Sequence, residues 1–230
     1  MISENLQKIR ATLKPEVRLV AVSKFHPVEA LQEAYNAGQR IFGENHVQEL
    51  VAKEAVLPKD IEWHFIGHLQ TNKVKYIAPF VSLIHSMDSL KLMKEIDKQG
   101  QKCGRVIDVL LQIHVAAEET KFGFTPEEVL QMLDEGEWRN YTHVRIVGLM
   151  AMATNTDNEA QIAQEFDIVQ RLFNTLKADY FADKPEFKEL SMGMSGDYLI
   201  AQAHGSTMVR VGSMIFGARN YNTTQWQQST

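Results

Sequence analysis

Short apolar runs alternate along this chain with longer segments whose apolar residues recur every three or four positions. The first run, residues 19–22, has four apolar residues in succession and is soon followed by Pro27. A short run rich in β-branched residues is typical of a strand buried on both faces of a parallel sheet. The same pattern predicts strands at residues 18–23, 40–42, 61–66, 81–85, 106–115, 144–150, 188–191 and 208–211.

The segments between these runs have the spacing and the end signals of helices. Leu6, Ile9 and Leu13 form the apolar face of a first helix, which Ser3 can cap and Pro15 ends. The later helices are predicted from Pro27 to Gly38, from a cap at Asn45, at 70–78, from a cap at Asp88 or Ser89 to Gly100, from the capping box at 125–128, and at 158–177 and 197–203.

Eight strands that alternate with helices over 230 residues predict a single (β/α)8 barrel, a TIM barrel, preceded by one extra helix. An open, doubly wound sheet is the alternative. No linker or change in composition marks a boundary, so we expect residues 1–230 to form one domain. The polar segment 220–230 is expected to fray.

Composition narrows the class of protein. The chain has 24 basic and 29 acidic residues, a net charge of −5, and no basic run, which disfavours binding to nucleic acid. Its single cysteine, Cys103, fits a reducing compartment. No run of 18 apolar residues is present, and the N-terminal segment is polar. We therefore expect a cytoplasmic protein that does not enter a membrane.

Lys24 is the first candidate for chemistry, because it falls just past the end of the first strand. In parallel α/β sheets and barrels, the carboxyl ends of the strands carry the functional groups. A lysine there can serve as a cation for a phosphate or as an amine that forms a Schiff base. A solvated lysine in a loop is the plain alternative.

Two turns of small residues follow the last two predicted strands. The first is residues 191–196 and the second is Gly212-Ser213. Barrels often bind phosphate at these loops, through backbone N–H groups and short hydroxyls. Ser195 and Ser213 offer hydroxyls, while Gly196 and Gly212 offer accessible backbone. Tight turns without a ligand are the alternative.

Several other motifs do not meet their requirements. Residues 193–196 match neither a dinucleotide-binding fingerprint nor a P-loop, and Asp197 stands where a nucleophile elbow needs glycine. His64 and His68 are four apart, which separates them by about 13 Å on a strand. No metal site is therefore predicted.

A lysine after the first strand and phosphate turns after the last two indicate a ligand with both an aldehyde and a phosphate. Pyridoxal 5′-phosphate has both groups, and Arg210 in the last strand could meet its pyridine nitrogen. A class I aldolase would also need a lysine and a phosphate site. These residues alone leave the two possibilities open.

Several motifs along the chain occur together, in this order, in one known family. The chain resembles the pyridoxal phosphate homeostasis proteins, single-domain relatives of the alanine racemase barrel. The matching motifs are AVSK at 21–24 with Pro27, GENHVQE at 43–49, WHFIGHLQTNK at 63–73, HSMD at 85–88, KFGF at 121–124, GLMAM at 148–152, SMGMSGD at 191–197 and GSTMVRVGSMIFGAR at 205–219.

The resemblance implies a set of cofactor-binding residues. It implies pyridoxal phosphate as a covalent imine on Lys24 and Arg210 near the pyridine nitrogen. It further implies phosphate contacts from Ser195, Gly212 and Ser213, with Asn45 and Ser86 facing the cofactor. Because arginine keeps its proton, it would leave the ring nitrogen unprotonated and the ring a weaker electron sink.

The resemblance also implies a role in vitamin B6 homeostasis, with indirect effects on amino- and keto-acid metabolism. A racemase of this fold takes a second base from a C-terminal domain of a partner subunit, and the predicted strands use the chain up to Gly217. We therefore expect a monomeric binding protein without catalytic residues, which delivers its cofactor transiently to apoenzymes. A racemase-like enzyme of low activity is the alternative.

Overall fold

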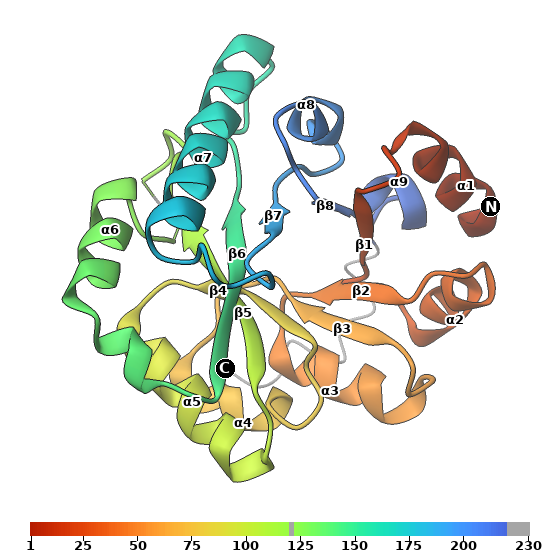
Figure 1. Ribbon diagram of the computed structural model, residues 1–230. Helices are drawn as coiled ribbons and strands as arrows, with labels where there is room; N and C mark the ends of the chain where they lie inside the picture. Colours follow the sequence, from red (N-terminus) through yellow and green to blue (C-terminus); the bar gives the residue numbers. More distant parts are fainter. Residues whose placement is uncertain (120–121, 220–230) are drawn as a thin grey trace.

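The computed structural model describes residues 1–119 and 122–219. Its parallel strands close into a barrel in chain order, with β8 paired to β1 (Figure 1). Closure between the first and last strands excludes the doubly wound sheet and confirms the predicted (β/α)8 barrel. The strands are β1 (Arg18–Val22), β2 (Ile41–Glu44), β3 (Glu62–Phe65), β4 (Leu83–Met87), β5 (Ile107–Ile113), β6 (Val144–Ala151), β7 (Glu189–Ser191) and β8 (Met208–Val211).

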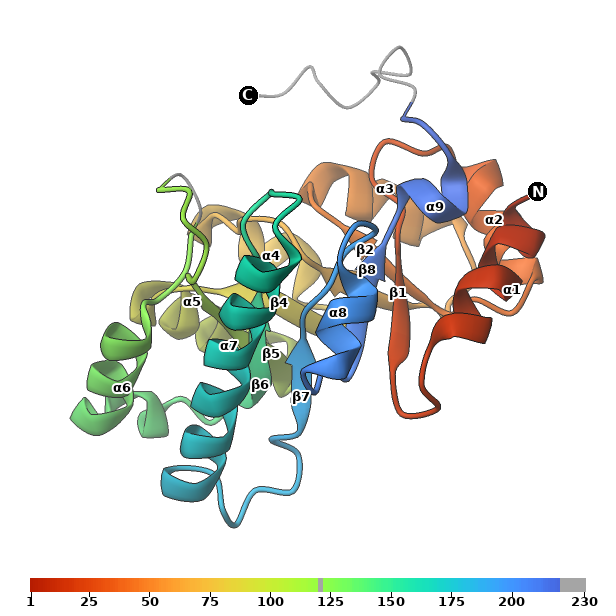
Figure 2. The same ribbon diagram turned by 90° about the horizontal axis from the view of Figure 1, so that it is seen from above.

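The helices surround the strands in both views of the molecule (Figure 1; Figure 2). The helix before β1 contacts α2 and α9, which confirms the predicted extra N-terminal helix. The helices are α1 (Ile2–Thr12), α2 (Val28–Asn36), α3 (Val47–Val56), α4 (Val74–Ile77), α5 (Leu90–Cys103), α6 (Pro126–Glu135), α7 (Glu159–Asp179), α8 (Tyr198–Ala203) and α9 (Ser213–Phe216), with short 3₁₀ helices η1 (Thr71–Lys73) and η2 (Glu137–Asn140).

Alternation of side chains along the strands divides the core into an inner and an outer layer. On β1, for example, Val20 packs inside the barrel, whereas Leu19 and Ala21 pack outward against the helices. The inner apolar layer consists of Val20, Leu83, Leu110, Val147, Met150 and Met208. Because side chains fill the interior, a ligand is confined to the rim of the barrel.

The beginnings of three helices differ from the prediction. Ser3 lies inside α1, whose N-cap is Met1, and Glu33 of α2 accepts the N–H of Ile2 at 3.3 Å. Pro27 is the N-cap of α2 rather than its first residue. His46, not Asn45, is the N-cap of α3, so Asn45 belongs to the strand end.

Helix α5 also ends later than predicted. It continues past Gly100 to Cys103, and Gly104 ends it with φ +64°. A Cβ on Gly100 would lie 2.9 Å from the carbonyl oxygens of Arg105 and His143. This glycine therefore permits a close approach of backbone to the helix, and does not mark the end of the helix. Ser89 caps α5 and Thr125 forms the capping box of α6, as predicted.

Some predictions lie outside the described residues. The expectation that segment 220–230 frays is one, and Lys121 of the KFGF motif is another. No helix in the described part of the chain is long and apolar enough to cross a membrane.

Gly148 provides a test of the barrel wall, because its missing side chain lets β6 and β7 approach each other. A Cβ on Gly148 would lie 1.8 Å from the carbonyl oxygen of Glu189. We expect Gly148→Ala to lower the free energy of unfolding by about 3 kcal/mol or more, measured by denaturant unfolding. The control is Gly104→Ala, where no atom lies within 4 Å of the added Cβ and only backbone strain of about 1 kcal/mol is expected. Equal losses in the two variants would contradict this explanation.

Candidate functional site

The sequence-predicted site residues lie at the carboxyl ends of the strands. Since all strands are parallel and the barrel is closed, these ends form one rim. Lys24 follows β1, Asn45 follows β2, Ser86 lies near the end of β4, Ser195 lies between β7 and α8, Arg210 lies in β8, and Gly212 and Ser213 follow β8.

The two predicted phosphate turns meet in space. The hydroxyl oxygens of Ser195 and Ser213 lie 3.3 Å apart, although 18 residues separate them in the chain. A Cβ on Gly212 would lie 3.0 Å from the carbonyl oxygen of Val22, so this turn rests against the end of β1. No atom lies within 4 Å of the Cβ position of Gly196, whose backbone is open to approach. The turns thus lie beside the segment that carries Lys24.

Lys24 is partly buried, and burial lowers the pKa of its amine. Arg219 lowers this pKa further, whereas Glu44 and Glu49 oppose the shift. A lower pKa increases the fraction of neutral amine, which is the nucleophilic form.

The residue after Lys24 has an unusual backbone. Phe25 has φ +63°, a left-handed conformation that costs a residue with a side chain about 1–2 kcal/mol. Its N–H donates to Glu49 at 2.7 Å, which stabilises this turn.

Asn45 and Ser86 have buried oxygen atoms that no hydrogen bond satisfies within the described residues. These atoms are Oδ1 of Asn45 and Oγ of Ser86. Buried polar atoms in native proteins almost always have partners, so such atoms need an explanation. Gly67 helps to place Asn45, because a Cβ on Gly67 would lie 2.5 Å from the Asn45 carbonyl oxygen.

Arg210 is buried and directed into the barrel. Its guanidinium donates to the carbonyl oxygen of Ser191 at 3.0 Å, to the hydroxyl of Ser191, and to the carbonyl oxygen of Ala151 at 3.2 Å. Burial lowers the pKa of Arg210 to about 10, so the side chain remains protonated at neutral pH. Arginine can only donate, so any further partner must be an acceptor.

A chain of hydrogen bonds continues from Arg210 through the interior of the barrel. Ser191 Oγ lies 2.9 Å from His85 Nδ1, and His85 Nε2 lies 2.9 Å from His64 Nδ1. Because Arg210 donates to Ser191, we infer that the Ser191 hydroxyl donates to His85 and that His85 donates to His64. His64 in turn lines a cavity of about 260 Å³ at the other end of the barrel.

The sequence did not predict this chain of hydrogen bonds. From the sequence, His64 was considered only in relation to His68, as one of a pair of metal ligands. His64 is buried between Trp63 and Phe65 of the outer core, whereas His68 is exposed and lies 3.3 Å from Asp88. Alternation along β3 is the signal that could have placed His64 inside the barrel.

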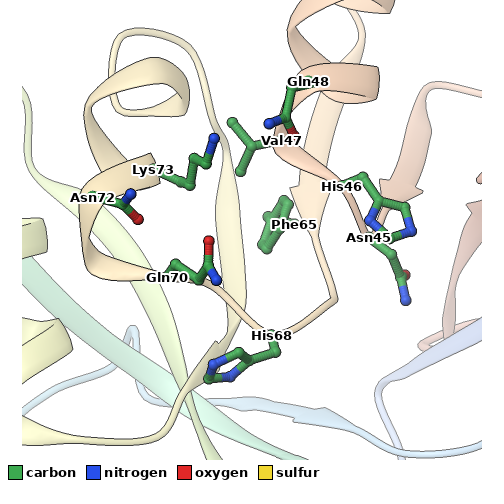
Figure 3. A pocket seen from close by; sticks show the side chains of 9 residues that line it. All are labelled: Asn45, His46, Val47, Gln48, Phe65, His68, Gln70, Asn72 and Lys73. Carbon is green, nitrogen blue, oxygen red and sulfur yellow. The ribbon is translucent and has the colours of Figure 1, made fainter. Parts of the chain in front are cut away.

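A cavity of about 530 Å³ opens beside Asn45, within the range of small-molecule sites. Residues at the start of α3 face the β3–α4 connection across it, with Phe65 between them (Figure 3). Its lining is Asn45, His46, Val47, Gln48, Phe65, His68, Gln70, Asn72 and Lys73, which includes no carboxylate. In the sequence these two segments served only as family motifs, and the cavity between them was not predicted.

Comparison with known sequences gives consistent matches. The family model described as the N-terminal domain of alanine racemase matches residues 1–220. A pyridoxal phosphate homeostasis protein of Aquifex aeolicus is 41% identical over 209 residues, which cover 89% of this chain and 88% of that protein. One of Schizosaccharomyces pombe is 41% identical over 206 residues, which cover 88% and 84%.

Solved structures agree with the sequence matches. PipY of Synechococcus elongatus, solved without PLP, has a TM-score of 0.88 and 38% identity, covering 94% of this chain and all of PipY. With PLP bound, PipY has a TM-score of 0.85. Alanine racemase of Streptomyces coelicolor has a TM-score of 0.75 at 19% identity, covering 94% of this chain and 58% of the racemase, which is a likeness of fold.

The buried histidines generate a prediction about acid stability. Burial lowers the pKa of His64 to about 3, whereas an unfolded histidine has a pKa of about 6.5. Between these values the unfolded chain binds a proton that the folded chain does not, so the stability falls as the pH falls. At about 1.4 kcal/mol per pH unit, His64 accounts for about 2 kcal/mol lost at pH 5.

The variant His64→Asn removes the titrating group from this position. We expect its free energy of unfolding to fall between pH 7 and pH 5 by about 2 kcal/mol less than that of the wild type. Denaturant unfolding at the two pH values measures this. The contributions of groups away from His64 are common to both proteins and cancel in the difference, whereas the neighbouring His85, whose pKa His64 helps to lower, adds to it in the same direction. Identical pH profiles would refute the assignment.

Proposed function

Because the chain belongs to the family of pyridoxal phosphate homeostasis proteins, we propose that it binds pyridoxal 5′-phosphate and serves intracellular vitamin B6 homeostasis. The observation that carries the proposal is that the turn at Gly212, next to the paired hydroxyls of Ser195 and Ser213, rests against the end of β1, two residues before Lys24. PipY, which binds PLP in its solved structure, supports it. Effects on amino- and keto-acid metabolism follow indirectly, through the enzymes that need the cofactor.

The roles of the site residues follow from their chemistry. Pyridoxal phosphate supplies an aldehyde, which condenses with an amine, and a phosphate dianion. Lys24 provides the amine, and its lowered pKa increases the neutral form that condensation requires. Ser195, Ser213 and the backbone at Gly212 hold the phosphate by hydrogen bonds.

The remaining site residues fit the same ligand. Asn45 and Ser86 each keep a buried oxygen without a partner in the described chain, and a polar ligand at the rim would supply partners for both. Arg210 remains a donor, which suits a pyridine nitrogen that accepts a hydrogen bond.

We assign the protein a carrier role rather than an enzymatic one. An unprotonated pyridine ring is a weak electron sink, and this disfavours chemistry at a bound amino acid. The names of the relatives describe homeostasis rather than a reaction. The alternative, a racemase-like enzyme of low activity, requires amino-acid turnover well above that of free pyridoxal phosphate. An amino-acid turnover assay with the purified protein decides between them.

The carrier role has consequences for the oligomeric state, the location and the partners of the protein. We propose a monomeric, cytoplasmic, one-domain protein that transfers its cofactor transiently to apoenzymes. Sedimentation analysis tests the monomer. Transfer is tested by the rate at which a PLP-dependent apoenzyme gains activity from the loaded protein, compared with an equal amount of free cofactor.

The variant Lys24→Ala tests the covalent anchor. With added pyridoxal phosphate, borohydride reduction and peptide mass mapping should find one adduct on Lys24 in the wild type and none at the site in the variant. The variant should still bind the cofactor weakly, because the phosphate turns are intact. The control Lys73→Ala should keep the adduct on Lys24. Adducts scattered over surface lysines in the wild type would refute the proposal.

The variants Ser195→Ala and Ser213→Ala test the phosphate turns. Each removes a hydroxyl that donates to a charged acceptor, so we expect about tenfold weaker binding of pyridoxal phosphate, measured by titration. Pyridoxal, which has no phosphate, serves as the control ligand, and its affinity should be equal in wild type and variants. An equal loss for both ligands would indicate general damage to the site.

A further inference from the structure

A buried cluster of charged side chains lies behind the segment that carries Lys24. It consists of Glu44, Glu49 and Lys53, whose side chains are at most 1% exposed. The ammonium of Lys53 donates to Glu44 at 2.7 Å, to Glu49 at 2.8 Å and to the carbonyl oxygen of Ser23 at 2.8 Å. All three donors of the lysine are thus used.

The cluster holds the residues on both sides of Lys24. The hydroxyl of Ser23 donates to Glu44 at 2.6 Å, and the N–H of Phe25 donates to Glu49 at 2.7 Å. With the bond from Lys53 to the Ser23 carbonyl, three contacts fix the backbone that flanks Lys24. One of them stabilises the left-handed turn at Phe25.

Stability alone does not account for this cluster. Each carboxylate uses its Oε1 atom for its contacts, and the Oε2 atoms of Glu44 and Glu49 have no partner in the described residues. Burial raises the pKa of Glu44 to about 7, and the carboxylate of Glu49 adds to this effect. Replacing such buried ion pairs by apolar residues of similar volume is often neutral or stabilising. Apolar residues could fill this space, but they could not make the hydrogen bonds that the cluster makes to Ser23 and Phe25.

We propose that Glu44, Glu49 and Lys53 are positioning residues, which fix the turn at 23–25 so that the amine of Lys24 meets the cofactor aldehyde. The inference rests on the proposed function. In the step concerned, the neutral amine nitrogen attacks the aldehyde carbon and a C=N bond forms. Water leaves with the aldehyde oxygen and the two amine protons. The gain from a fixed turn lies in the orientation of the two reacting groups.

The decisive variant is the apolar triple replacement Glu44→Leu, Glu49→Met and Lys53→Met. It removes the three charges together, so no unpaired buried charge remains and the fold is expected to persist. The single variant Glu49→Met removes the acceptor of the Phe25 N–H and leaves Lys53 paired with Glu44, so it decides the question if the triple variant does not fold. The matched control is Glu189→Gln, which weakens the 2.9 Å bond from Arg18. Glu189 is far from Lys24 along the sequence.

Two ligands separate positioning from general damage. Pyridoxal phosphate reports imine formation through its visible absorbance, whereas pyridoxamine 5′-phosphate has an amine in place of the aldehyde and reports only non-covalent binding. In the cluster variants we expect imine formation to slow about tenfold or more, with pyridoxamine phosphate binding unchanged. This slowing is expected even though loss of Glu44 and Glu49 lowers the pKa of Lys24 and so leaves more of its amine neutral. The control should form the imine at the wild-type rate.

The possible failures are distinguishable. If the wild type forms no reducible adduct on Lys24, the proposed function is wrong. If the wild type forms the adduct and the cluster variants form it at the same rate, only the positioning role is overturned. An equal loss of rate in the Glu189→Gln control, or an equal loss of affinity for both ligands, also overturns it.

Discussion

The pairing of β8 with β1 is the constraint on which the candidate site depends. In this ladder Val20 lies opposite Arg210, and the two strands then end at the same rim. Lys24 follows one strand and Gly212 follows the other. Residues that are almost a whole chain length apart in the sequence are therefore close in space. In an open sheet with the same strands these residues could lie on opposite edges. One ladder of hydrogen bonds therefore brings the segment that carries Lys24 beside the turn at Gly212.

Two buried polar networks lie on opposite sides of the barrel wall, and both end at the rim. The inner one runs from Arg210 through Ser191 to the two histidines, and the outer one is centred on Lys53. Burying polar groups is costly unless they are satisfied, and apolar side chains would fill the same space at lower cost. Each network instead supports a residue that the proposed function needs. These two groups of buried polar residues thus reach the rim that carries the candidate site.

The sequence predicted the elements well where the signal was local. The alternation of apolar runs and amphipathic segments specified the barrel, and the position of Lys24 after β1 followed from it. Features that depend on distant residues were missed. Glu49 and Lys53 are four apart on a helix, a spacing typical of exposed ion pairs, and only the packing of α3 on β2 and β3 buries them. Gly100 looked like a helix end because its close neighbour His143 is remote in sequence.

On the proposed function, the charges around the candidate site suit holding a cofactor better than using it as an electron sink. At Lys24, burial and Arg219 favour the neutral amine, while Glu44 and Glu49 limit the lowering of its pKa. Arg210 keeps its proton and can only donate, so on the proposed function a ring nitrogen that accepts from it would carry no proton. On the proposed function, the bond to the carrier forms readily while the electron demand of amino-acid chemistry is poorly met. The same barrel can therefore serve binding in one family and catalysis in another, because the site residues and not the fold determine which occurs.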